Sequence, residues 1–427
     1  MKKSKQLNRW LWKWHIIAGL VCVPVIALLC ITGSMYLFKN IYNDYAYSNE
    51  RFAVVSNNAV ARPYTEQLAA AKKAADGHIV SVTLPSRDDM NTAFKVHAKG
   101  HARNYVYVNP YTNEVAGTYQ QRESLMYTVR KLHGELLLGL PGTLLVELVA
   151  SWFIVLALTG VYVWWPQTKF SLAGFFSIRT NNTRQVFWRD MHAVVGFWMS
   201  AFMLIILAGG LPWTEIFGDN LRWVQAKTDT GYPQHWRNSK GLTSTIPSPQ
   251  SKPLSIDQVV AISQTQNLAG EITIKIPLQQ DGVYTVSNNA LWLDDQRVLH
   301  LDQYSGASIK ALSWSQVGIL MDLRQVFMRL HQGQYSVINL IVVLLIALTF
   351  FVATLASLIS YLVRKPKGRW GLPKVPETFN AGLPVVLMIA ILGLVFPAFG
   401  LSVLLIIGFE QLAKFVRKTN RVPASSQ

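Results

Sequence analysis

The sequence is poor in charged residues and in cysteine. Only 15% of its 427 residues are charged, against roughly 25% in a typical soluble domain, and 51% are hydrophobic. This composition argues against an ordinary soluble enzyme. Cys22 and Cys30 are the only cysteines and lie in one apolar stretch, which predicts neither a disulfide framework nor a cysteine-based metal site.

Several chemical motifs are also missing from the sequence. It has no Gly-rich nucleotide-binding loop, nucleophile elbow, His-Glu-x-x-His helix or Cys-x-x-Cys-His haem attachment signal. The formal net charge of +17 is compatible with nucleic-acid binding, but the excess Lys and Arg stand in short stretches beside long apolar runs. We therefore expect the lipid bilayer as partner and no nucleic acid.

Long apolar runs predict an α-helical polytopic membrane protein. A bilayer core about 30 Å thick needs about 20 apolar residues in a helix. The last run contains Pro397 and Gly400, which predicts either one kinked helix or a hairpin of two short helices. The qualifying stretches are residues 16–38, 142–164, 193–213, 337–362 and 382–409.

Charge predicts the orientation of these spans. Residues 1–13, 166–190 and 364–378 and the C-terminal tail together hold 18 Lys and Arg against 3 acids. The positive-inside rule makes all four cytoplasmic, which requires the last stretch to cross twice. Six tryptophans at the cytoplasmic ends fit an interfacial belt: Trp10, Trp12, Trp14, Trp164, Trp165 and Trp188.

These considerations divide the chain into spans and loops. We predict four core spans in two repeats, a C-terminal span or hairpin, and two large loops on the outer side. The predicted segments are a tail (1–13), span 1 (14–40), polar segment 1 (41–132), span 2 (133–165), a cytoplasmic loop (166–190), span 3 (191–213), polar segment 2 (214–328), span 4 (329–363), a second loop (364–380), the C-terminal span or hairpin (381–412) and a tail (413–427).

Each polar segment predicts a small α+β module. Residues 62–76 and 253–267 have helical periodicity after a proline. Turn signals stand at 109–113 and 303–306. Short alternating runs predict strands at residues 79–84, 94–97, 105–108, 272–276, 282–286 and 290–293.

Four histidines stand at the starts of four different spans, which is the basis for the repeat. His15 and His192 are 177 residues apart, and His133 and His331 are 198 apart. The topology places the first pair at the cytoplasmic face and the second at the outer face. Two imidazoles on facing helices are what an iron porphyrin needs for its axial bonds, so the pairs are candidate sites for two non-covalent b-type haems.

Basic residues precede these histidines by two or three positions. Arg130, Arg189 and Arg329 are candidates to pair with haem propionates, and Lys13 takes this place before His15. The alternative for each histidine is a polar anchor at a helix end. The alternative role of the basic residues is positive-inside anchoring. It fits Lys13 and Arg189 at the cytoplasmic face but does not explain Arg130 and Arg329 at the outer face.

The other residues that could bind a metal, move protons or assist electron transfer are less informative. For the other five histidines, a surface position is favoured over a metal site: His78, His97, His101, His235 and His300. Glu147 lies within the second span, where it either relays protons or hydrogen-bonds a neighbour. Trp152 and Trp198 are candidates to assist electron transfer between the two faces.

The second span carries the most specific motif. Leu132-His133-Gly134-Glu135 is followed by Leu158-Thr159-Gly160 and Trp164-Trp165-Pro166, and Ile31-Thr32-Gly33 repeats the Thr-Gly element. These residues resemble the PepSY-associated transmembrane family over nearly the whole chain. The fourth span departs from the pattern, with Thr354-Leu355-Ala356-Ser357 where glycine is expected.

The resemblance implies a bacterial inner-membrane protein with two periplasmic PepSY modules. Some family members are haem-containing reductases that release iron from ferric siderophores. By that resemblance the haem ligands are His15, His133, His192 and His331, the substrate is a ferric siderophore, and the electron donor is cytoplasmic or a quinol. A non-enzymatic PepSY protein that binds or regulates a periplasmic partner is the alternative. A permease is disfavoured, because matching discontinuous spans are absent from the two halves.

Overall fold

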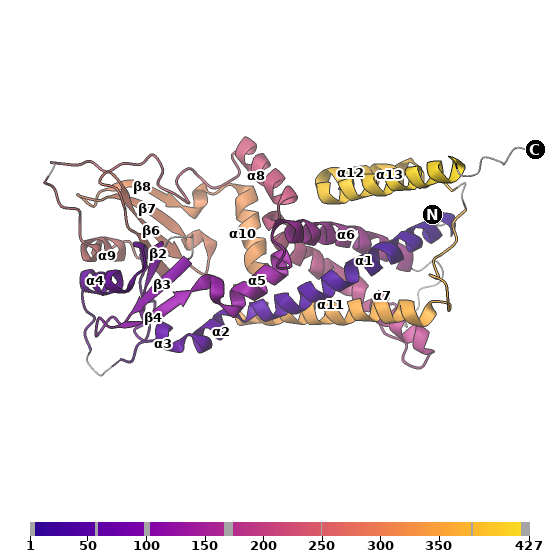
Figure 1. The fold of residues 1–427 in the computed structure, drawn as a ribbon, viewed down its shortest axis with the longest axis horizontal. Coiled ribbons are helices and arrows are strands. Elements are labelled where there is room, and N and C mark those ends of the chain that lie inside the picture. The colour runs from indigo at the N-terminus through magenta and orange to yellow at the C-terminus, as the bar shows by residue number, and fades with distance from the viewer. Residues whose placement is uncertain are drawn as a thin grey trace, which may run out of the picture.

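A computed structural model describes residues 5–55, 59–97, 103–165, 174–248, 250–376 and 379–419. Figure 1 shows an elongated molecule with an antiparallel sheet at one end and a bundle of long helices at the other. Helices α5, α8 and α10 lie at the junction of the two parts (Figure 1). We call the end of the helical bundle next to the sheet the sheet side, and the opposite end the far side.

Among the residues that the structure describes, five helices are long and apolar enough to cross a membrane, which confirms a multi-pass membrane protein. Four of them form the bundle, in which α1 packs against α6 and α11, and α7 packs against α11. The four are α1 (Lys5–Leu37), α6 (Leu140–Trp164), α7 (Arg184–Gly210) and α11 (Val337–Arg364).

The C-terminal stretch is a hairpin rather than one kinked helix. Helix α12 (Leu383–Val395) and helix α13 (Pro397–Thr419) pack against each other, and α13 is the fifth candidate span. Pro397 begins α13 because proline has no N–H to donate and fits the first turn of a helix. Trp152 attaches the hairpin to the bundle: its Nε1 donates to Ser402 Oγ at 3.0 Å, and its ring lies 4.9 Å from that of Phe399.

Two spans are preceded by separate short helices that the sequence analysis merged with them. His133 belongs to α5 (Leu125–Glu135) and His331 is the last residue of α10 (Ile319–His331). Left-handed backbone at Leu136, with φ of 49°, ends α5, and Gly333, with φ of 64°, follows α10. Both histidines therefore lie before α6 and α11 rather than at their first residues.

The strands of both polar segments form one eight-stranded antiparallel sheet in the order β4-β3-β2-β1-β5-β6-β7-β8. The segments meet where Val82 of β1 pairs with Ile274 of β5. The strands are β1 (His78–Thr83), β2 (Thr92–His97), β3 (Arg103–Val108), β4 (Val115–Gln120), β5 (Glu271–Lys275), β6 (Val283–Asn289), β7 (Arg297–Asp302) and β8 (Ser308–Ser313).

The expected strands at 79–84, 94–97, 105–108, 272–276 and 282–286 fall on β1, β2, β3, β5 and β6. The strand expected at 290–293 was wrong, because Leu291 and Trp292 are exposed and the chain turns there. Strands β4, β7 and β8 were not predicted from the sequence. Strand β7 is buried along almost its whole length and has no alternation, while β4 and β8 are edge strands of mixed polarity.

One helix from each polar segment packs on the sheet, as predicted. Helices α4 (Tyr64–Ala74) and α9 (Ile256–Gln264) contact each other and share one hydrophobic core with the strands, including Ala71, Val259 and Phe94. The Asp257 carboxylate accepts hydrogen bonds from the backbone N–H groups of Tyr64 and Thr65 at 2.5 and 3.1 Å. These contacts join the two segments into one unit.

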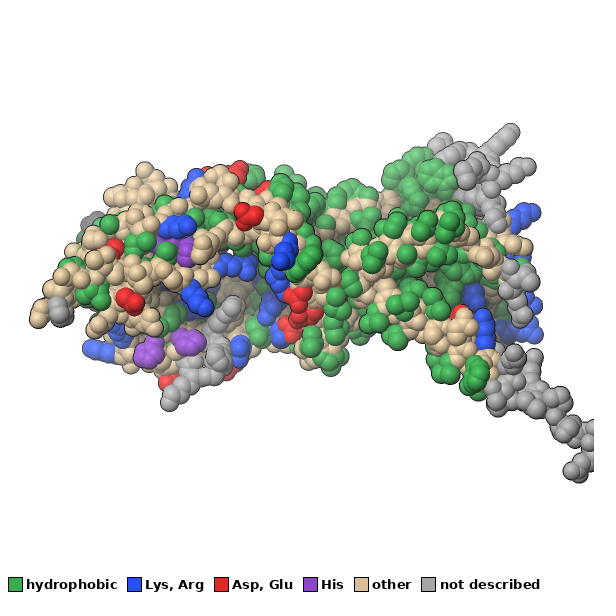
Figure 2. Space-filling model, turned by 90° about the horizontal axis from the view of Figure 1, so that it is seen from above, with side chains coloured by type: hydrophobic (Ala, Val, Ile, Leu, Met, Phe, Trp, Pro, Cys, Tyr) green, Lys and Arg blue, Asp and Glu red, His purple; other side chains and the backbone are tan. Residues whose placement is uncertain are grey.

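Connecting helices and surface chemistry complete the fold. Figure 2 shows hydrophobic side chains covering much of the helical part, and Lys and Arg side chains at its far side. This distribution suits a belt of lipid around the bundle. The connecting helices are α2 (Lys39–Ala46), α3 (Ser48–Arg51) and α8 (Ile216–Thr228).

Candidate functional site: two histidine pairs

The four histidines at the spans come together as two pairs. The ring centroids of His15 and His192 are 6.3 Å apart, with an interplanar angle of 49°. Those of His133 and His331 are 6.1 Å apart, at 67°. Each pair joins residues from the two halves of the chain, in the combination that the predicted topology required.

These separations are suited to one metal ion between two imidazoles. A metal–imidazole bond of about 2 Å on each side, plus the distance from nitrogen to ring centre, gives a centroid separation of about 6 Å. Edge-to-face ring contact gives similar separations, as between His235 and His300 at 6.2 Å and 79°. The spacing therefore leaves room for one metal ion in each pair, and the hydrogen bonds of each ring show whether a nitrogen is free to bind it.

His15 is oriented by a threonine on a neighbouring helix. Its Nδ1 lies 3.0 Å from Oγ1 of Thr159 on α6. The Thr159 hydroxyl donates its own hydrogen to the Val155 carbonyl at 2.8 Å. Because that hydrogen is already used, the Thr159 oxygen accepts, and His15 must carry its proton on Nδ1.

His133 has the same arrangement with α1. Its Nδ1 lies 3.0 Å from Oγ1 of Thr32, and the Thr32 hydroxyl donates to the Leu28 carbonyl at 2.8 Å, with Leu29 O next nearest at 3.4 Å. Thr32 and Thr159 are the threonines of the two Thr-Gly elements. Their hydroxyls therefore set the protonated nitrogen of both histidines in the first half of the chain.

The two histidines of the second half bond directly to backbone carbonyls. His192 Nδ1 donates to Ala353 O at 3.2 Å, and His331 Nδ1 donates to Ile206 O at 2.7 Å. Ile206 follows Leu29 by the 177 residues that separate His192 from His15. Ala353 likewise follows Val155 by the 198 residues that separate His331 from His133. At the positions that correspond to Thr32 and Thr159 by these separations, the second half has Gly209 and Ser357. The Ser357 hydroxyl donates to Thr354 O at 2.6 Å, and both imidazoles of this half bond directly to carbonyls.

All four histidines are consequently protonated on Nδ1, which leaves the Nε2 lone pair available. None of the hydrogen bonds found among the described residues uses Nε2 of these four side chains. A metal-bound histidine normally donates its other N–H to a carbonyl or hydroxyl in this way, which fixes the ring and strengthens the ligand. The donor set therefore fits two bis-histidine iron sites of the haem b type.

Two glycines make room for the imidazoles. A Cβ on Gly33 would lie 3.1 Å from Cε1 of His133, and a Cβ on Gly160 would lie 3.1 Å from Cε1 of His15. Gly19 and Gly196, one turn after His15 and His192 in their helices, would have nothing within 4 Å of such an atom. The Thr-Gly element thus supplies a hydrogen-bond acceptor and a space for the ring in adjacent residues.

The two pairs lie at different depths in the bundle. His15 and Thr32, the partner of His133, are 17 residues apart on α1, which is about 25 Å along a helix. A buried cluster containing Cys30, Phe153 and Phe350 lies between them, and the two Phe rings are 5.2 Å apart. The tryptophans expected to assist lie elsewhere: Trp152 contacts the C-terminal hairpin, and Trp198 is 42% exposed.

The three candidate arginines have different surroundings. Arg130 is exposed, with its guanidinium 4.9 Å from the Tyr127 ring centre. Arg189 is exposed and forms an ion pair of 3.0 Å with Asp190, which Arg179 also binds. Arg329 is buried, and its Nη1 donates to the carbonyls of Ala290 and Leu291 next to the sheet. Arg329 thus has a structural contact that the sequence did not reveal.

The other described histidines differ from the four. His300 is buried between β6 and β7, against the expected surface position, and uses both nitrogens: Nδ1 with Thr285 Oγ1 at 3.0 Å and Nε2 with His235 O at 2.9 Å. Burial lowers the pKa of His300. His101 lies outside the described residues. In the described part of the chain, no three His, Cys, Asp or Glu side chains are grouped as a metal site.

Glu147 has a structural contact. It is fully buried in α6, and its two carboxylate oxygens accept from the backbone N–H groups of Ile216 and Phe217 at 2.9 and 2.8 Å. These N–H groups begin α8 and have no partner within the helix. Of the two roles open from the sequence, the hydrogen bond to a neighbour is the one observed.

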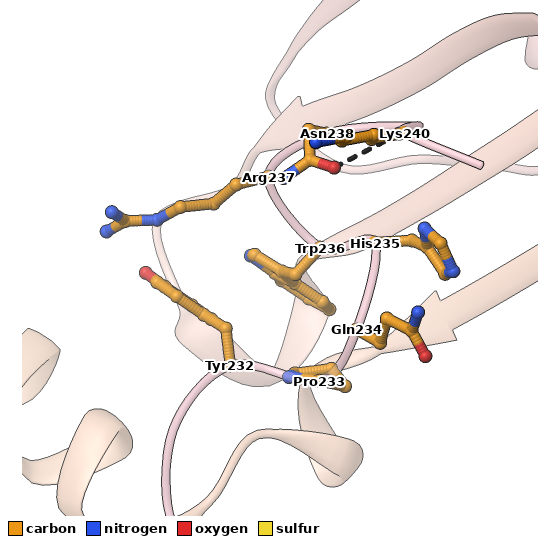
Figure 3. Close-up of a pocket in the computed structure, with 8 residues that line it drawn as sticks. All are labelled: Tyr232, Pro233, Gln234, His235, Trp236, Arg237, Asn238 and Lys240. Carbon is orange, nitrogen blue, oxygen red and sulfur yellow. Dashed lines mark hydrogen bonds between the residues drawn. The ribbon is translucent and has the colours of Figure 1, made fainter. Parts of the chain in front are cut away.

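A hollow of about 380 Å³ lies on the sheet part, along the loop 232–240 (Figure 3). The rings of Tyr232 and Trp236 are nearly parallel, 6° apart, with centroids 5.8 Å apart. The Arg237 guanidinium lies 4.7 Å from the Tyr232 ring centre, and Lys240 also lines the hollow. Its charged lining is entirely basic, which favours an anionic ligand.

Comparison with known proteins agrees with the resemblance seen in the sequence. The family model described as the PepSY-associated TM region matches residues 12–370. This range includes all four paired histidines and both Thr-Gly elements. No match was found among curated proteins. Because the family model covers most of the sequence, the chain belongs to the PepSY-associated transmembrane family.

Proposed function

We propose that the protein carries electrons through the membrane on two b-type haems, bound by His15 with His192 and by His133 with His331. The observation that carries this proposal is the combination of two imidazole pairs at iron-ligand spacing, each with Nδ1 bonded and Nε2 available. Unlike His300, which uses both ring nitrogens in hydrogen bonds, these four histidines keep Nε2 for a ligand.

We place the protein in a bacterial inner membrane with the sheet in the periplasm. The basic segments 1–13, 166–190 and 364–378 support this orientation, because cytoplasmic loops carry the excess of Lys and Arg. We also interpret each half of the chain as one copy of a repeat with a PepSY-like module. The mirrored strand order about β1 and β5 and the separations of 177 and 198 residues support this interpretation.

The bound haems would supply one-electron chemistry, while the chain positions them and insulates them from water. Thr32 and Thr159 orient two ligands, and the carbonyls of Ile206 and Ala353 orient the other two. The cluster around Phe153 and Phe350 keeps the space between the pairs apolar. We propose that Arg130, Arg189 and Arg329 pair with the haem propionates. Arg329 has fewer N–H groups free for this role, because its Nη1 donates to the carbonyls of Ala290 and Leu291.

The proposed substrate is a ferric siderophore, reduced from Fe³⁺ to Fe²⁺ on the periplasmic side during iron uptake. Hard oxygen ligands hold ferrous iron less tightly, so the added electron releases the metal. Because β1 pairs with β5, the two modules form one continuous sheet and leave no space for the chelate between these strands. We therefore assign the chelate to the basic, aromatic hollow at Tyr232, Trp236 and Arg237. The electron donor in this scheme is a cytoplasmic protein or a quinol.

Haem content tests the first part of the proposal. Purified protein should show sharp reduced-minus-oxidised bands and two haems per chain. His331→Ala and His15→Ala should each remove one haem, while His78→Ala, at an exposed position on β1, should remove none. A colourless protein expressed with ample haem would contradict the proposal and favour a non-enzymatic PepSY protein that binds a periplasmic partner.

Reoxidation tests the substrate. The dithionite-reduced protein, freed of excess reductant, should be reoxidised by ferric siderophores. For each electron that the haems lose, one Fe³⁺ becomes Fe²⁺ and should be captured by a ferrous chelator. Arg237→Ala should slow this step without changing haem content. Reduced protein that is stable to every ferric chelate but is reoxidised by quinone would leave the haems in place and exclude the siderophore reductase.

A further inference from the structure

An apolar cavity of about 310 Å³ lies apart from the histidine pairs, at the sheet side of the bundle. Residues of α6, α7, α8 and α10 line it, together with Phe396 at the turn of the C-terminal hairpin. No residue of α1 or α5 is among the lining residues, so neither His133 nor its partner Thr32 borders the cavity, while Phe327 of the lining lies one helical turn before His331.

Arg324 is the only charged residue in this lining. It is 5% exposed, and its Nε is buried without a hydrogen-bond partner. Its guanidinium lies 4.2 Å from the Trp213 ring centre. A buried cation normally has an anionic partner, because an uncompensated charge in an apolar site costs several kcal/mol.

The charges around Arg324 are basic. Arg222 and Arg237 are close enough to oppose its positive charge, and burial with this repulsion lowers the pKa of Arg324 to about 10. Arg222 is paired with Asp219, and among the described residues the groups that shift the pKa of Arg324 include no carboxylate. The site therefore has a positive potential directed at the polar end of an apolar cavity.

The cavity extends from this cation into the membrane-spanning part. Leu211 and Leu204, both in the lining, are seven residues apart in the sequence, which is about 10 Å along a helix. Trp213 and Trp223 are 42% and 63% exposed at the same end, where tryptophan marks the boundary between lipid and water. An occupant would have its polar group at this boundary and its apolar part along α7.

We propose that this cavity binds an anionic phospholipid of the leaflet on the sheet side, with its phosphate on Arg324 and one acyl chain between Leu211 and Leu204. The positive charge of Arg324 favours an anionic phospholipid over a quinone, because a neutral quinone would leave the guanidinium charge uncompensated. The acyl chain lies against Phe327 and Phe396 and thus links α10, which ends in His331, to the C-terminal hairpin. The site does not depend on the proposed haems.

The test is lipid binding by the whole protein in detergent. Native mass spectrometry should find about one phosphatidylglycerol retained per chain, and added phosphatidylglycerol should raise the unfolding temperature of delipidated protein. Phosphatidylcholine and inorganic phosphate should each give a much smaller rise, because the first lacks net charge and the second lacks the apolar chain.

Three variants make the test specific. Arg324→Gln should weaken phosphatidylglycerol binding about tenfold or more, the usual effect of losing a charged hydrogen bond. Ala208→Phe keeps the cation but fills the cavity, and should also weaken binding. Arg222→Gln, which removes a neighbouring arginine outside the lining, should change binding less than threefold.

Arg324→Gln removes an unpartnered buried charge, so the delipidated variant should unfold at or above the wild-type temperature. Equal retention of phosphatidylglycerol by wild type and by both cavity variants would overturn the proposal. Finding a quinone or part of a haem in the cavity in place of a phospholipid, and its loss in Arg324→Gln, would overturn the proposal as well. Response to inorganic phosphate alone would show a simple anion site and contradict the lipid.

Discussion

His133 on α5 donates to Thr32 on α1, and Thr32 in turn donates to a carbonyl one turn earlier in its own helix. The threonine hydroxyl therefore acts only as an acceptor toward the imidazole, and Nε2 of His133 is left for a ligand. His15 and Thr159 repeat this relationship at the other pair. Because a residue on a neighbouring helix sets the tautomer of each histidine, the availability of Nε2 for a metal depends on how the helices pack.

Substitutions of Thr159 should separate the role of its hydroxyl from that of the carbonyl behind it. Thr159→Val fills the same space without an acceptor, so His15 loses its partner and haem affinity at this pair should fall about 10- to 100-fold. Thr159→Ala should retain more haem, because it exposes Val155 O, as in the second half of the chain. Haem titration of the two variants measures the difference, and equal affinities would contradict this account.

Gly33→Ala should disturb His133, because the new methyl group would lie 3.1 Å from the imidazole. We expect the haem at His133 and His331 to be lost or bound more weakly. The spectrum of the haem at His15 and His192 should not change. Gly408→Ala is the matched control: it lies within helix α13, away from both histidine pairs, has nothing within 4 Å, and gains the same helix propensity of about 1 kcal/mol. Identical haem spectra in the two variants would argue against the spacing role of Gly33.

Glu147→Gln should weaken the start of α8. The carboxylate accepts two backbone hydrogen bonds, whereas an amide offers one oxygen and turns an NH₂ group toward the second N–H. We expect a loss of about 1–3 kcal/mol of stability and faster hydrogen exchange at Ile216 and Phe217. Glu114→Gln, at an exposed position, should leave both unchanged. Unaltered exchange in Glu147→Gln would exclude the capping role.

The sheet should lose stability in acid because of His300. Its burial holds the pKa below the ordinary value of 6.5, with Lys275, Lys310 and the ring of His235 adding repulsion. The unfolded chain therefore binds a proton that the folded sheet does not, and the free energy of unfolding falls as the pH drops below 6.5. Hydrogen exchange of β6 and β7, corrected for the intrinsic rate, should accelerate between pH 7.5 and about 5.5. His300→Gln should reduce this pH dependence; an unchanged dependence would assign it to another group.

Sequence patterns predicted the spans and the candidate histidines better than they predicted the sheet. Apolar runs of about 20 residues are unambiguous in a bilayer, and the His15, His133, His192 and His331 positions stood out by their recurrence. Strand β7 was missed because Val298 to Asp302 is continuously buried, and residues 290–293 were wrongly assigned because an exposed apolar turn has the composition of a strand. The contacts that orient the imidazoles were also hidden, because every residue has a carbonyl and only packing selects Ile206 and Ala353.

The sequence by itself determined the membrane class, the apolar spans, the basic segments and the family, because hydropathy, charge and motif are properties of local stretches of chain. The tertiary structure decided which nitrogen of each paired histidine is protonated and that the two polar segments share one sheet. Those features depend on contacts between residues more than a hundred positions apart, such as His15 with Thr159 and Val82 with Ile274. Long-range packing of this kind leaves no periodic signal in the sequence.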